Sequence, residues 1–260
     1  MFPISDNLPT LRRPIVTWLV LAGMWATWLL IEQGGMNPVA LIAAVCNYGL
    51  VPGELTGGAP IGLAVPVGEG LACVVDNDPI NWLTPITSMF LHGSWAHIIG
   101  NSLFLWVFGN NVEDSMGHGR YAIFYLLTGL AASAAHVLVT PGSPIPTVGA
   151  SGAISGVLGA YLILYPRARV NMLFILFFIF IRPIPAFIVL LYWFAIQVIT
   201  GLPELTSVRS EVSGGVAVWA HVGGFVAGVV LVKLFADPRL VAAHQAAHAD
   251  SHGYLWRSRR

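Results

Sequence analysis

Three short stretches of the chain combine serine, histidine and asparagine with glycine. GASGAISG contains Ser151 and Ser155, AHVGGFVAG contains His221, and LHGSWAHIIGN contains His92, His97 and Asn101. A serine hydroxyl needs a base to take its proton, and histidine is the usual one. Acyl transfer then places negative charge on a carbonyl oxygen, which fixed N–H donors stabilise. Together these residue types suit a serine nucleophile, a histidine base and an oxyanion hole.

The composition predicts that helices crossing a membrane position these residues. Of the 260 residues, 56% are hydrophobic and 9% are charged, whereas a soluble domain carries about 25% charged residues. A spanning helix needs about 20 apolar residues. We predict an all-α membrane protein with six transmembrane helices. The predicted spans are 15–31, 95–109 with an extension back to residue 89, 121–139, 148–165, 184–202 and 216–235. The apolar segment 170–181 is too short to span, so we expect an interfacial or re-entrant connection.

The basic residues predict the orientation, because Lys and Arg favour the cytoplasmic side. With the N-terminus inside, every Lys and Arg except Arg209 falls on the cytoplasmic side. The long outer first loop, 32–91, contains acidic residues and no Lys or Arg. Residues 1–14 and 237–260 become cytoplasmic polar tails around a membrane domain of 15–236. We expect a multi-pass protein of a bacterial inner membrane, without a cleaved signal peptide and without a nucleic-acid partner. Cys46 and Cys73 share the outer loop, and the sequence leaves their pairing open.

This topology brings the polar residues to one level near the outer surface. Ser151 begins the fourth span, which enters from outside, and His221 lies in the first turns of the sixth. His97 and Asn101 are four residues apart and share one helix face. His92 falls just before that helix or in its first turn.

Glycine spacing explains how the serine and the histidine meet. Gly152 and Gly156 mark one face of the fourth span, and Gly224 and Gly228 mark one face of the sixth. Small residues four apart let membrane helices approach closely. No Asp or Glu lies in a span near the outer surface, so the sequence predicts a Ser–His dyad without a third acidic member.

Other interpretations of these residues were weighed. A small-residue motif is usually only a packing device, and a hydrolase elbow would need Gly at Ala153. Metal binding by the three site histidines lacks an accompanying carboxylate, so we expect no metal. His136 is interpreted as structural. In the C-terminal tail, His244, His248 and His252 have helical spacing and are expected to form a solvated face.

The three motifs, in this order on the second, fourth and sixth spans, resemble the rhomboid family of intramembrane serine proteases. The resemblance extends over most of residues 12–236 and includes NYGLVP, FGNNVED and YPRAR. It implies that Ser151, flanked by Gly149 and Gly152, is the nucleophile and that His221 is the general base. It also implies an oxyanion hole of Asn101, His97 and the Ser151 amide, with His92 in support. The implied substrates are transmembrane proteins in the lipid bilayer, cleaved near the outer face without a cofactor.

Two positions depart from the family pattern. Many rhomboids have Trp-Arg in the first loop, but here Leu83 follows Trp82. Many also have an aromatic residue four positions after the serine, which packs on the catalytic imidazole. Ser155 occupies that position, where we expect a local hydrogen bond.

Two other functions remain as alternatives. A non-catalytic rhomboid-like protein would bind transmembrane clients, but such relatives typically lack the Ser or the His. A small transporter or channel would be expected to show internal repeats with paired broken helices, which this sequence lacks. Covalent labelling of the serine separates the enzyme from both.

Overall fold

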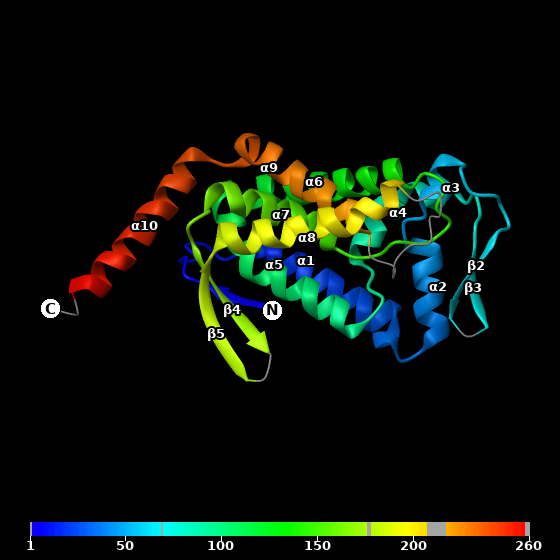
Figure 1. Ribbon diagram of the computed structural model, residues 1–260, viewed down its shortest axis with the longest axis horizontal. Helices are drawn as coiled ribbons and strands as arrows, with labels where there is room; N and C mark the ends of the chain where they lie inside the picture. The colour runs from blue at the N-terminus through cyan, green and yellow to red at the C-terminus, as the bar shows by residue number, and fades with distance from the viewer. Residues whose placement is uncertain (1, 69, 176–177, 207–216, 258–260) are drawn as a thin grey trace.

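The computed structural model describes residues 2–68, 70–175, 178–206 and 217–257 as a mostly helical protein (Figure 1). Six helices run roughly along the long axis of the molecule and form a bundle. They are α1 (Ile15–Ala26, continued by a π-helical turn, Thr27–Ile31), α5 (Trp95–Met116), α6 (His118–Val139), α7 (Ser151–Leu164), α8 (Ala186–Thr206) and α9 (Val218–Phe235). Each of these helices overlaps one of the six predicted spans, although several of their bounds differ.

Length and hydropathy single out three described helices that can cross a membrane. They are His118–Val139, Ala186–Pro203 and Val218–Phe235. Ile15–Ile31, Pro38–Tyr48 and Ser151–Leu164 are shorter apolar helices. Apolar side chains such as Leu138, Ile199 and Leu234 point outward and are exposed, as expected for helices whose solvent is lipid.

Helix α5 differs from its predicted bounds. Ser94 caps its first turn, where its hydroxyl accepts the His97 N–H at 3.2 Å. The predicted extension back to residue 89 is wrong, because Ser88–Phe90 forms a separate 3₁₀ turn. The helix extends instead at its other end, as far as Met116.

The carboxylate of Glu113, in that C-terminal extension of α5, contacts the start of α1. It accepts the backbone N–H groups of Val16 and Thr17, both at 2.9 Å, and the Thr17 hydroxyl at 2.7 Å. Those amides belong to the first turn of α1, where N–H groups have no carbonyl acceptor within the helix. The last turn of α5 therefore caps the start of α1.

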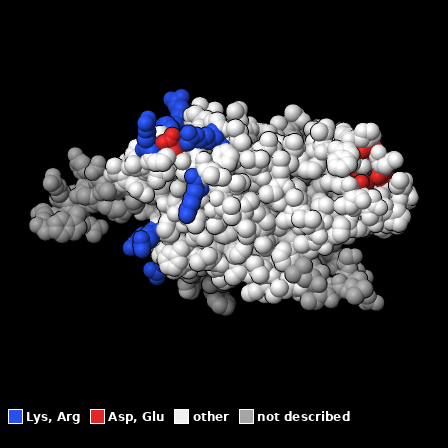
Figure 2. All heavy atoms as spheres, turned by 90° about the horizontal axis from the view of Figure 1, so that it is seen from above, with Lys and Arg blue, Asp and Glu red and all other residues white. Residues whose placement is uncertain are grey.

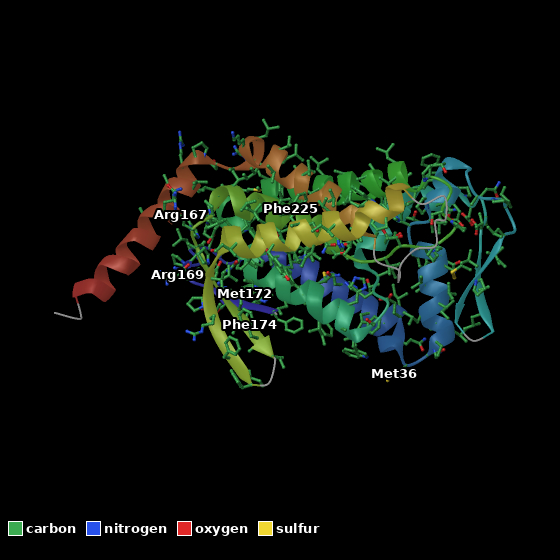
Figure 3. All side chains as sticks on the ribbon, viewed as in Figure 1. Met36, Arg167, Arg169, Met172, Phe174 and Phe225 are labelled. Atoms are coloured by element: carbon green, nitrogen blue, oxygen red, sulfur yellow. A yellow bond between two sulfur atoms is a disulfide. The ribbon has the colours of Figure 1, made fainter. Side chains whose placement is uncertain are left out.

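The N-terminal tail and the 170–181 connection form a sheet that the sequence did not predict. Strands β1 (Phe2–Asp6), β4 (Arg169–Ile175) and β5 (Ile179–Pro185) pair antiparallel in the order β1-β4-β5. The β4–β5 hairpin projects sideways from the bundle, with Arg169 at its base and Phe174 farther along (Figure 3). Along β4, Val170 and Met172 are buried, and Asn171 between them is not. This strand-like alternation is too short, in a segment this apolar, to be recognised in the sequence.

The sheet is joined to the bundle through Asp6. Its carboxylate accepts hydrogen bonds from the Tyr161 hydroxyl at 2.5 Å and the Asn111 amide at 2.7 Å. Burial raises the pKa of Asp6 to about 6, although these hydrogen bonds oppose the shift.

The C-terminal tail is a helix, α10 (Pro238–Arg257), that leaves the bundle at the same end as the sheet. The predicted solvated histidine face is wrong at His244, which is fully buried. Its Nε2 lies 3.1 Å from Asn111 Oδ1, and its ring packs against Tyr165 at a centroid distance of 4.9 Å. Helical spacing alone did not reveal this docking, because the partners lie on α5 and at the end of α7.

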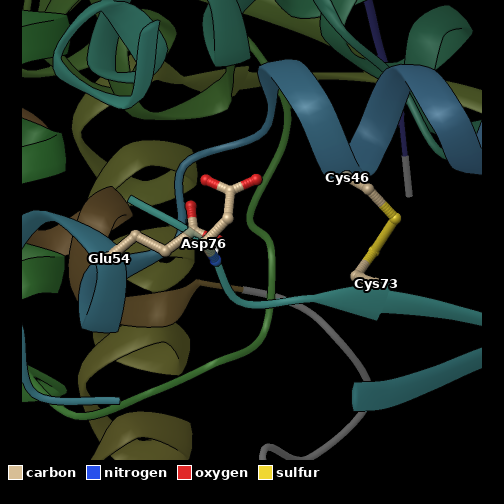
Figure 4. Close-up of a disulfide and its surroundings, with 4 residues drawn as sticks. All are labelled: Cys46, Glu54, Cys73 and Asp76. Atoms are coloured by element: carbon tan, nitrogen blue, oxygen red, sulfur yellow. Dashed lines mark hydrogen bonds between the residues drawn. A yellow bond between two sulfur atoms is a disulfide. The ribbon is translucent and has the colours of Figure 1, made fainter. Parts of the chain in front are cut away.

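Segment 32–91 is ordered by short elements at the opposite end of the molecule. They are α2 (Pro38–Tyr48), α3 (Pro52–Thr56), β2 (Ala64–Gly68), β3 (Leu71–Val74), the 3₁₀ turns Gln33–Gly35, Pro79–Leu83 and Ser88–Phe90, and α4 (Thr84–Thr87). A disulfide between Cys46 and Cys73 joins α2 to β3 and settles the pairing that the sequence left open (Figure 4). Nearby, the Glu54 carboxylate accepts the Asp76 N–H at 3.1 Å.

Basic side chains gather at one end of the molecule. On the face that Figure 2 shows, Lys and Arg lie near the sheet and α10, with an acidic group among them, and the other Asp and Glu atoms lie near the β2–β3 end. Two ion pairs at the basic end join Arg12 to Asp114 and Arg120 to Asp237. Arg209, Glu69, most of the predicted loop 203–215 and the last residues, 258–260, lie outside the described residues.

Candidate active site

The side chains of Ser151 and His221 meet between helices α7 and α9. Ser151 is the first residue of α7, and His221 lies in the first turn of α9. His221 Nε2 lies 2.7 Å from Ser151 Oγ. A proton can pass directly between a hydroxyl and an imidazole at this distance.

Glycines bring the backbones of α7 and α9 into contact. A Cβ built on Gly224 would overlap the carbonyl oxygen of Gly152, and one built on Gly228 would overlap that of Gly156. The close approach predicted from the glycine spacing is therefore present, with Gly224 and Gly228 pointing at α7. On α7 the glycine that points at α9 is Gly159, which the prediction did not name, because a Cβ there would overlap the Phe225 carbonyl oxygen.

Gly152 and Gly156 of α7 serve a different contact from the one predicted. A Cβ on Gly152 would lie 2.6 Å from the Ala132 Cβ, and one on Gly156 would overlap Thr128. Both contacts are with α6. The small residues of α7 and α9 thus pack three helices together and not two.

The loop before α7 holds Ser151 in place at two points. Thr147 and Leu50 exchange backbone hydrogen bonds of 2.8 and 2.9 Å, and the Gly149 N–H donates to the Ser88 carbonyl at 2.8 Å. Gly149 has a φ of 128°, which residues with a Cβ rarely adopt. Segment 32–91 therefore positions the turn that presents the serine.

His97 and Asn101 face this turn from α5. A Cβ built on Gly149 would lie 2.6 Å from His97 Nε2 and 3.6 Å from Asn101 Nδ2. The Ser151 amide belongs to the first turn of α7, where helix N–H groups lack intrahelical acceptors. Three N–H donors can therefore converge beside Ser151, which is the arrangement that an oxyanion requires.

His92 lies behind Asn101, before α5 begins. Its Nδ1 lies 3.2 Å from the Phe90 carbonyl oxygen, which can only accept, so Nδ1 carries the proton. Nε2 then accepts from Asn101 Nδ2 at 3.0 Å. In this tautomer His92 Nε2 has no proton to donate to the Asn101 carbonyl oxygen. His92 therefore fixes which end of the Asn101 amide faces Gly149.

Glu32 anchors the backbone of His92. It follows the first apolar helix and is fully buried, and its Oε1 accepts the His92 N–H at 2.8 Å. The other carboxylate oxygen, Oε2, has no hydrogen-bond partner among the described residues. Burial raises the pKa of Glu32 to about 7, against the opposing effect of the His92 hydrogen bond. Sequence reasoning noted this residue only as a loop acid.

A cavity of about 550 Å³ opens at these residues. Residues from α5, α6, the α6–α7 loop, α7, α8 and α9 line it, together with part of segment 32–91. They include Leu50, Ser88, His97, Asn101, Thr147, Gly149, Ser151, Trp193 and His221. Among the described residues that line the cavity, none is acidic.

Comparison with known proteins relates the chain to a family. A family model described as the rhomboid domain matches residues 79–238, more than half of the chain. The chain belongs to the rhomboid family. This family consists generally of intramembrane serine proteases, although some members are inactive.

Individual relatives of this rhomboid are similar over shorter stretches. It is 43% identical over 81 residues to rhomboid protease GluP of Bacillus subtilis (strain 168), which covers 31% of this chain and 15% of that protein. It is 31% identical over 164 residues to the Bacillus subtilis protein YdcA, covering 62% of this chain and 69% of that protein. It is 30% identical over 155 residues to the mitochondrial rhomboid protein 1 of Saccharomyces cerevisiae, covering 56% of this chain and 39% of that protein. The chain spans between 15% and 26% of the first three curated relatives it matches.

Ser155 forms the local hydrogen bond that was expected of it. Its hydroxyl donates to the Ser151 carbonyl at 2.6 Å, one turn back on α7. An aromatic ring nevertheless faces the imidazole from another helix. Trp193 on α8 lies 5.8 Å from the His221 ring, centroid to centroid, and Phe225 packs on the same tryptophan at 6.2 Å.

Gln197 is the site residue that sequence reasoning missed. It lies on α8, and its Oε1 is 2.8 Å from His221 Nδ1. Asp and Glu are the usual third members of a serine triad, and an amide in that position carries no charge that would mark it in the sequence. A polar residue inside the apolar segment FAIQVIT was the available signal.

The two remaining expectations concern His136 and the first loop. His136 is buried on α6, with Nε2 3.1 Å from the Thr147 hydroxyl. It contacts the loop before Ser151 and not the dyad, in keeping with a structural role. Trp82 and Leu83, where the family arginine is replaced, are 73% and 55% exposed.

Proposed function

We propose that the protein is an intramembrane serine endopeptidase. It hydrolyses peptide bonds in or near the transmembrane segments of membrane-protein substrates, with Ser151 as nucleophile and His221 as general base. The observation that carries the proposal is the 2.7 Å distance between His221 Nε2 and Ser151 Oγ beside a cavity. Membership of the rhomboid family supports it.

The first half of the reaction forms an acyl-enzyme. Ser151 Oγ attacks the carbonyl carbon of the scissile bond while His221 Nε2 takes the hydroxyl proton. The tetrahedral intermediate collapses, the C–N bond breaks, and the imidazolium gives its proton to the leaving amine. In the second half, His221 takes a proton from water, and the resulting hydroxide attacks the ester carbon. The C–O bond to Ser151 then breaks, and the imidazolium returns its proton to Ser151 Oγ.

Negative charge on the tetrahedral oxygen is stabilised by three donors. We assign these to the Asn101 amide, the His97 ring and the Ser151 backbone N–H. Loss of one such donor costs roughly 3 to 4 kcal/mol in other hydrolases. His92 supports this hole by fixing the Asn101 amide, and Gly149 leaves room for the oxygen between His97 and Ser151.

The proposed topology has six spans formed by α1 and α5 to α9. The membrane domain is 15–236, with 32–91 as the outer first loop and 1–14 and 237–260 on the cytoplasmic side. The basic end of the molecule in Figure 2 then faces the cytoplasm, as the positive-inside rule requires. We propose a bacterial plasma membrane as its location, and two of the similar proteins above are bacterial.

The substrate has to unwind before it can be cut. The carbonyl groups of a transmembrane helix are hydrogen-bonded within the helix, so a nucleophile cannot reach them. We propose that the substrate enters beside α8. Its apolar span is 17% buried, less than the 39% of α6 and the 28% of α9, and Trp193 of α8 lines the cavity.

Cleavage in proteoliposomes tests the proposal. Purified protein is incubated with a set of single-span substrates whose outer ends contain small residues, and fragments are identified by mass spectrometry. The wild type is expected to cut near the outer face, and folded Ser151→Ala and His221→Ala proteins are expected to be inactive. Cleavage by Ser151→Ala at the wild-type rate would rule out this serine as nucleophile. A folded wild type that cuts none of the substrates would leave the binding of transmembrane clients as the alternative.

A further inference from the structure

The imidazole of His221 is held from both sides. Nε2 lies 2.7 Å from Ser151 Oγ on α7, and Nδ1 lies 2.8 Å from Gln197 Oε1 on α8. Three helices thus contribute to one chain of polar atoms. A Ser–His dyad uses only the first of these two contacts.

An amide carbonyl on the Nδ1 side selects one form of the ring. Neutral imidazole has a single N–H, and Gln197 Oε1 can only accept, so the proton lies on Nδ1. Nε2 then has a lone pair directed at the Ser151 hydroxyl. In the other tautomer Nε2 carries the proton and cannot act as a base toward the serine.

Few ionisable groups surround this ring. His97 on α5 and His136 on α6 are its titratable neighbours, Ser151 faces it from α7, and Trp193 and Gln197 face it from α8. Among the described residues lining the cavity, none is acidic, so no carboxylate there competes for Nδ1–H. Aromatic packing by Trp193 limits rotation of the ring, but it provides no hydrogen-bond acceptor.

A neutral acceptor suits a site inside the membrane. A carboxylate in a hydrocarbon environment is costly when it is not paired with a cation. An amide orients the ring with a much smaller desolvation penalty. It also leaves the histidine less stabilised as imidazolium than an aspartate would.

We propose that Gln197 is the third member of the catalytic arrangement, a positioning residue that holds neutral His221 with its proton on Nδ1. This inference deepens the proposed function and rests on it. Gln197 acts through His221 and does not contact the reacting atoms. Because Gln197 lies on α8 and the dyad lies on α7 and α9, displacement of α8 breaks this contact and releases the ring.

Two substitutions separate hydrogen bonding from packing. Gln197→Met keeps the length and approximate volume of the side chain but removes the acceptor, and Gln197→Glu keeps the acceptor and adds a charge. Thr200→Val is the matched control on α8, because Thr200 is exposed and, among the described residues, bonds only to the carbonyls of Ile196 and Gln197 in its own helix. The readout is the second-order rate of labelling by a fluorophosphonate between pH 5 and pH 9.

We expect Gln197→Met to lower the labelling rate about 10- to 100-fold, within the range that general-base catalysis contributes. Gln197→Glu should label at the wild-type rate or faster at high pH, with its acidic limb moved up by about 1 pH unit, because a carboxylate stabilises the imidazolium. Thr200→Val should match the wild type. In ¹⁵N-histidine spectra of the neutral protein, His221 should be protonated on Nδ1 in the wild type and a mixture of tautomers in Gln197→Met.

The outcomes distinguish this inference from the proposed function. If the wild type is labelled and Ser151→Ala is not, but both Gln197 variants keep the wild-type rate and pH profile, the positioning role is overturned and the dyad stands. If the wild type is not labelled at Ser151, the proposed function itself fails. If Gln197→Met does not fold, Gln197→Glu still tests the inference. An acidic limb of its rate–pH profile at the wild-type position would overturn the positioning role and leave the proposed function standing.

Discussion

Gly228 on α9 lies directly against Gly156 on α7, so close that a Cβ on the first would overlap the carbonyl oxygen of the second. His221 is seven residues before Gly228 on the same helix, about two turns away. The separation of the two backbones at this contact therefore helps to set how closely the histidine approaches Ser151.

Gly228→Ala is expected to push α9 away from α7. Overpacking of a tight interface typically costs 1–3 kcal/mol, so we expect a free energy of unfolding lower by about 2 kcal/mol and a strong loss of activity. Thermal unfolding in detergent and peptide cleavage measure the two effects. Gly119→Ala on α6 is the control, because nothing lies within 4 Å of a Cβ there. Equal stability and activity of both variants would contradict this account of the interface.

Gly149→Ala should impair the oxyanion hole and strain the turn before Ser151. The residue has a φ of 128°, and an added Cβ would lie 2.6 Å from His97 Nε2. The expected result is a fall in kcat of about 100-fold, comparable with the loss of one oxyanion donor. Gly142→Ala, in the same loop with ordinary contact distances to Gly58, should retain wild-type kcat. A fully active Gly149→Ala enzyme would show that this space is not used.

Glu32 is expected to make stability depend on pH. Its pKa is raised from an ordinary 4.5 to about 7 in the folded protein, so the folded state keeps this proton when the unfolded chain has lost it. The free energy of unfolding therefore falls as the pH rises from about 4.5 to about 7. Glu32→Gln removes this titration and should be more stable than the wild type at pH 8, on the order of 2 kcal/mol, and similar at pH 4.5.

Thermal unfolding at pH 4.5 and pH 8 measures the effect of Glu32. Asp78→Asn is the control, because Asp78 is an exposed carboxylate whose role as a cap for Ile80 N–H can be kept by asparagine. The control should follow the wild-type pH dependence. A wild type that becomes more stable between pH 4.5 and pH 8, together with a Glu32→Gln variant of the same slope, would contradict the buried protonated carboxyl.

The Cys46–Cys73 disulfide is expected to stabilise segment 32–91, whose contacts with Thr147 and Gly149 hold the turn before Ser151. Removal of a disulfide of this kind typically costs 2–4 kcal/mol. Replacement of both cysteines by serine should lower the melting temperature and reduce activity. Dithiothreitol should do the same to the wild type and leave the double variant unchanged. Identical melting of the wild type with and without reductant would show that the bond adds no stability.

The sequence predicted which polar residues lie close together where topology decided it. The directions of the spans place Ser151, His97, Asn101 and His221 at one level, and the glycine spacing requires α7 and α9 to touch. These are properties of single helices and of their order along the chain, and both can be recognised from periodicity and composition.

The sequence predicted less well the contacts that depend on three-dimensional docking. Gln197 carries no charge and sits in an apolar helix, so its hydrogen bond to His221 follows only from the rotation of α8. The pairing of β1 with β4 joins residues far apart in the chain, and the burial of His244 depends on where α10 lies against Asn111. Pairing and docking of this kind leave little periodic trace in either partner.

The central claim is that His221 makes Ser151 nucleophilic, and covalent modification tests it most directly. Purified protein is treated with a fluorophosphonate at pH 7.5, digested, and sequenced by mass spectrometry, beside Ser151→Ala and His221→Ala. The account predicts a single adduct on Ser151 in the wild type, no adduct in Ser151→Ala and labelling at least about 100-fold slower in His221→Ala. An unmodified Ser151 in the folded wild type, or a rate unaffected by His221→Ala, would contradict it.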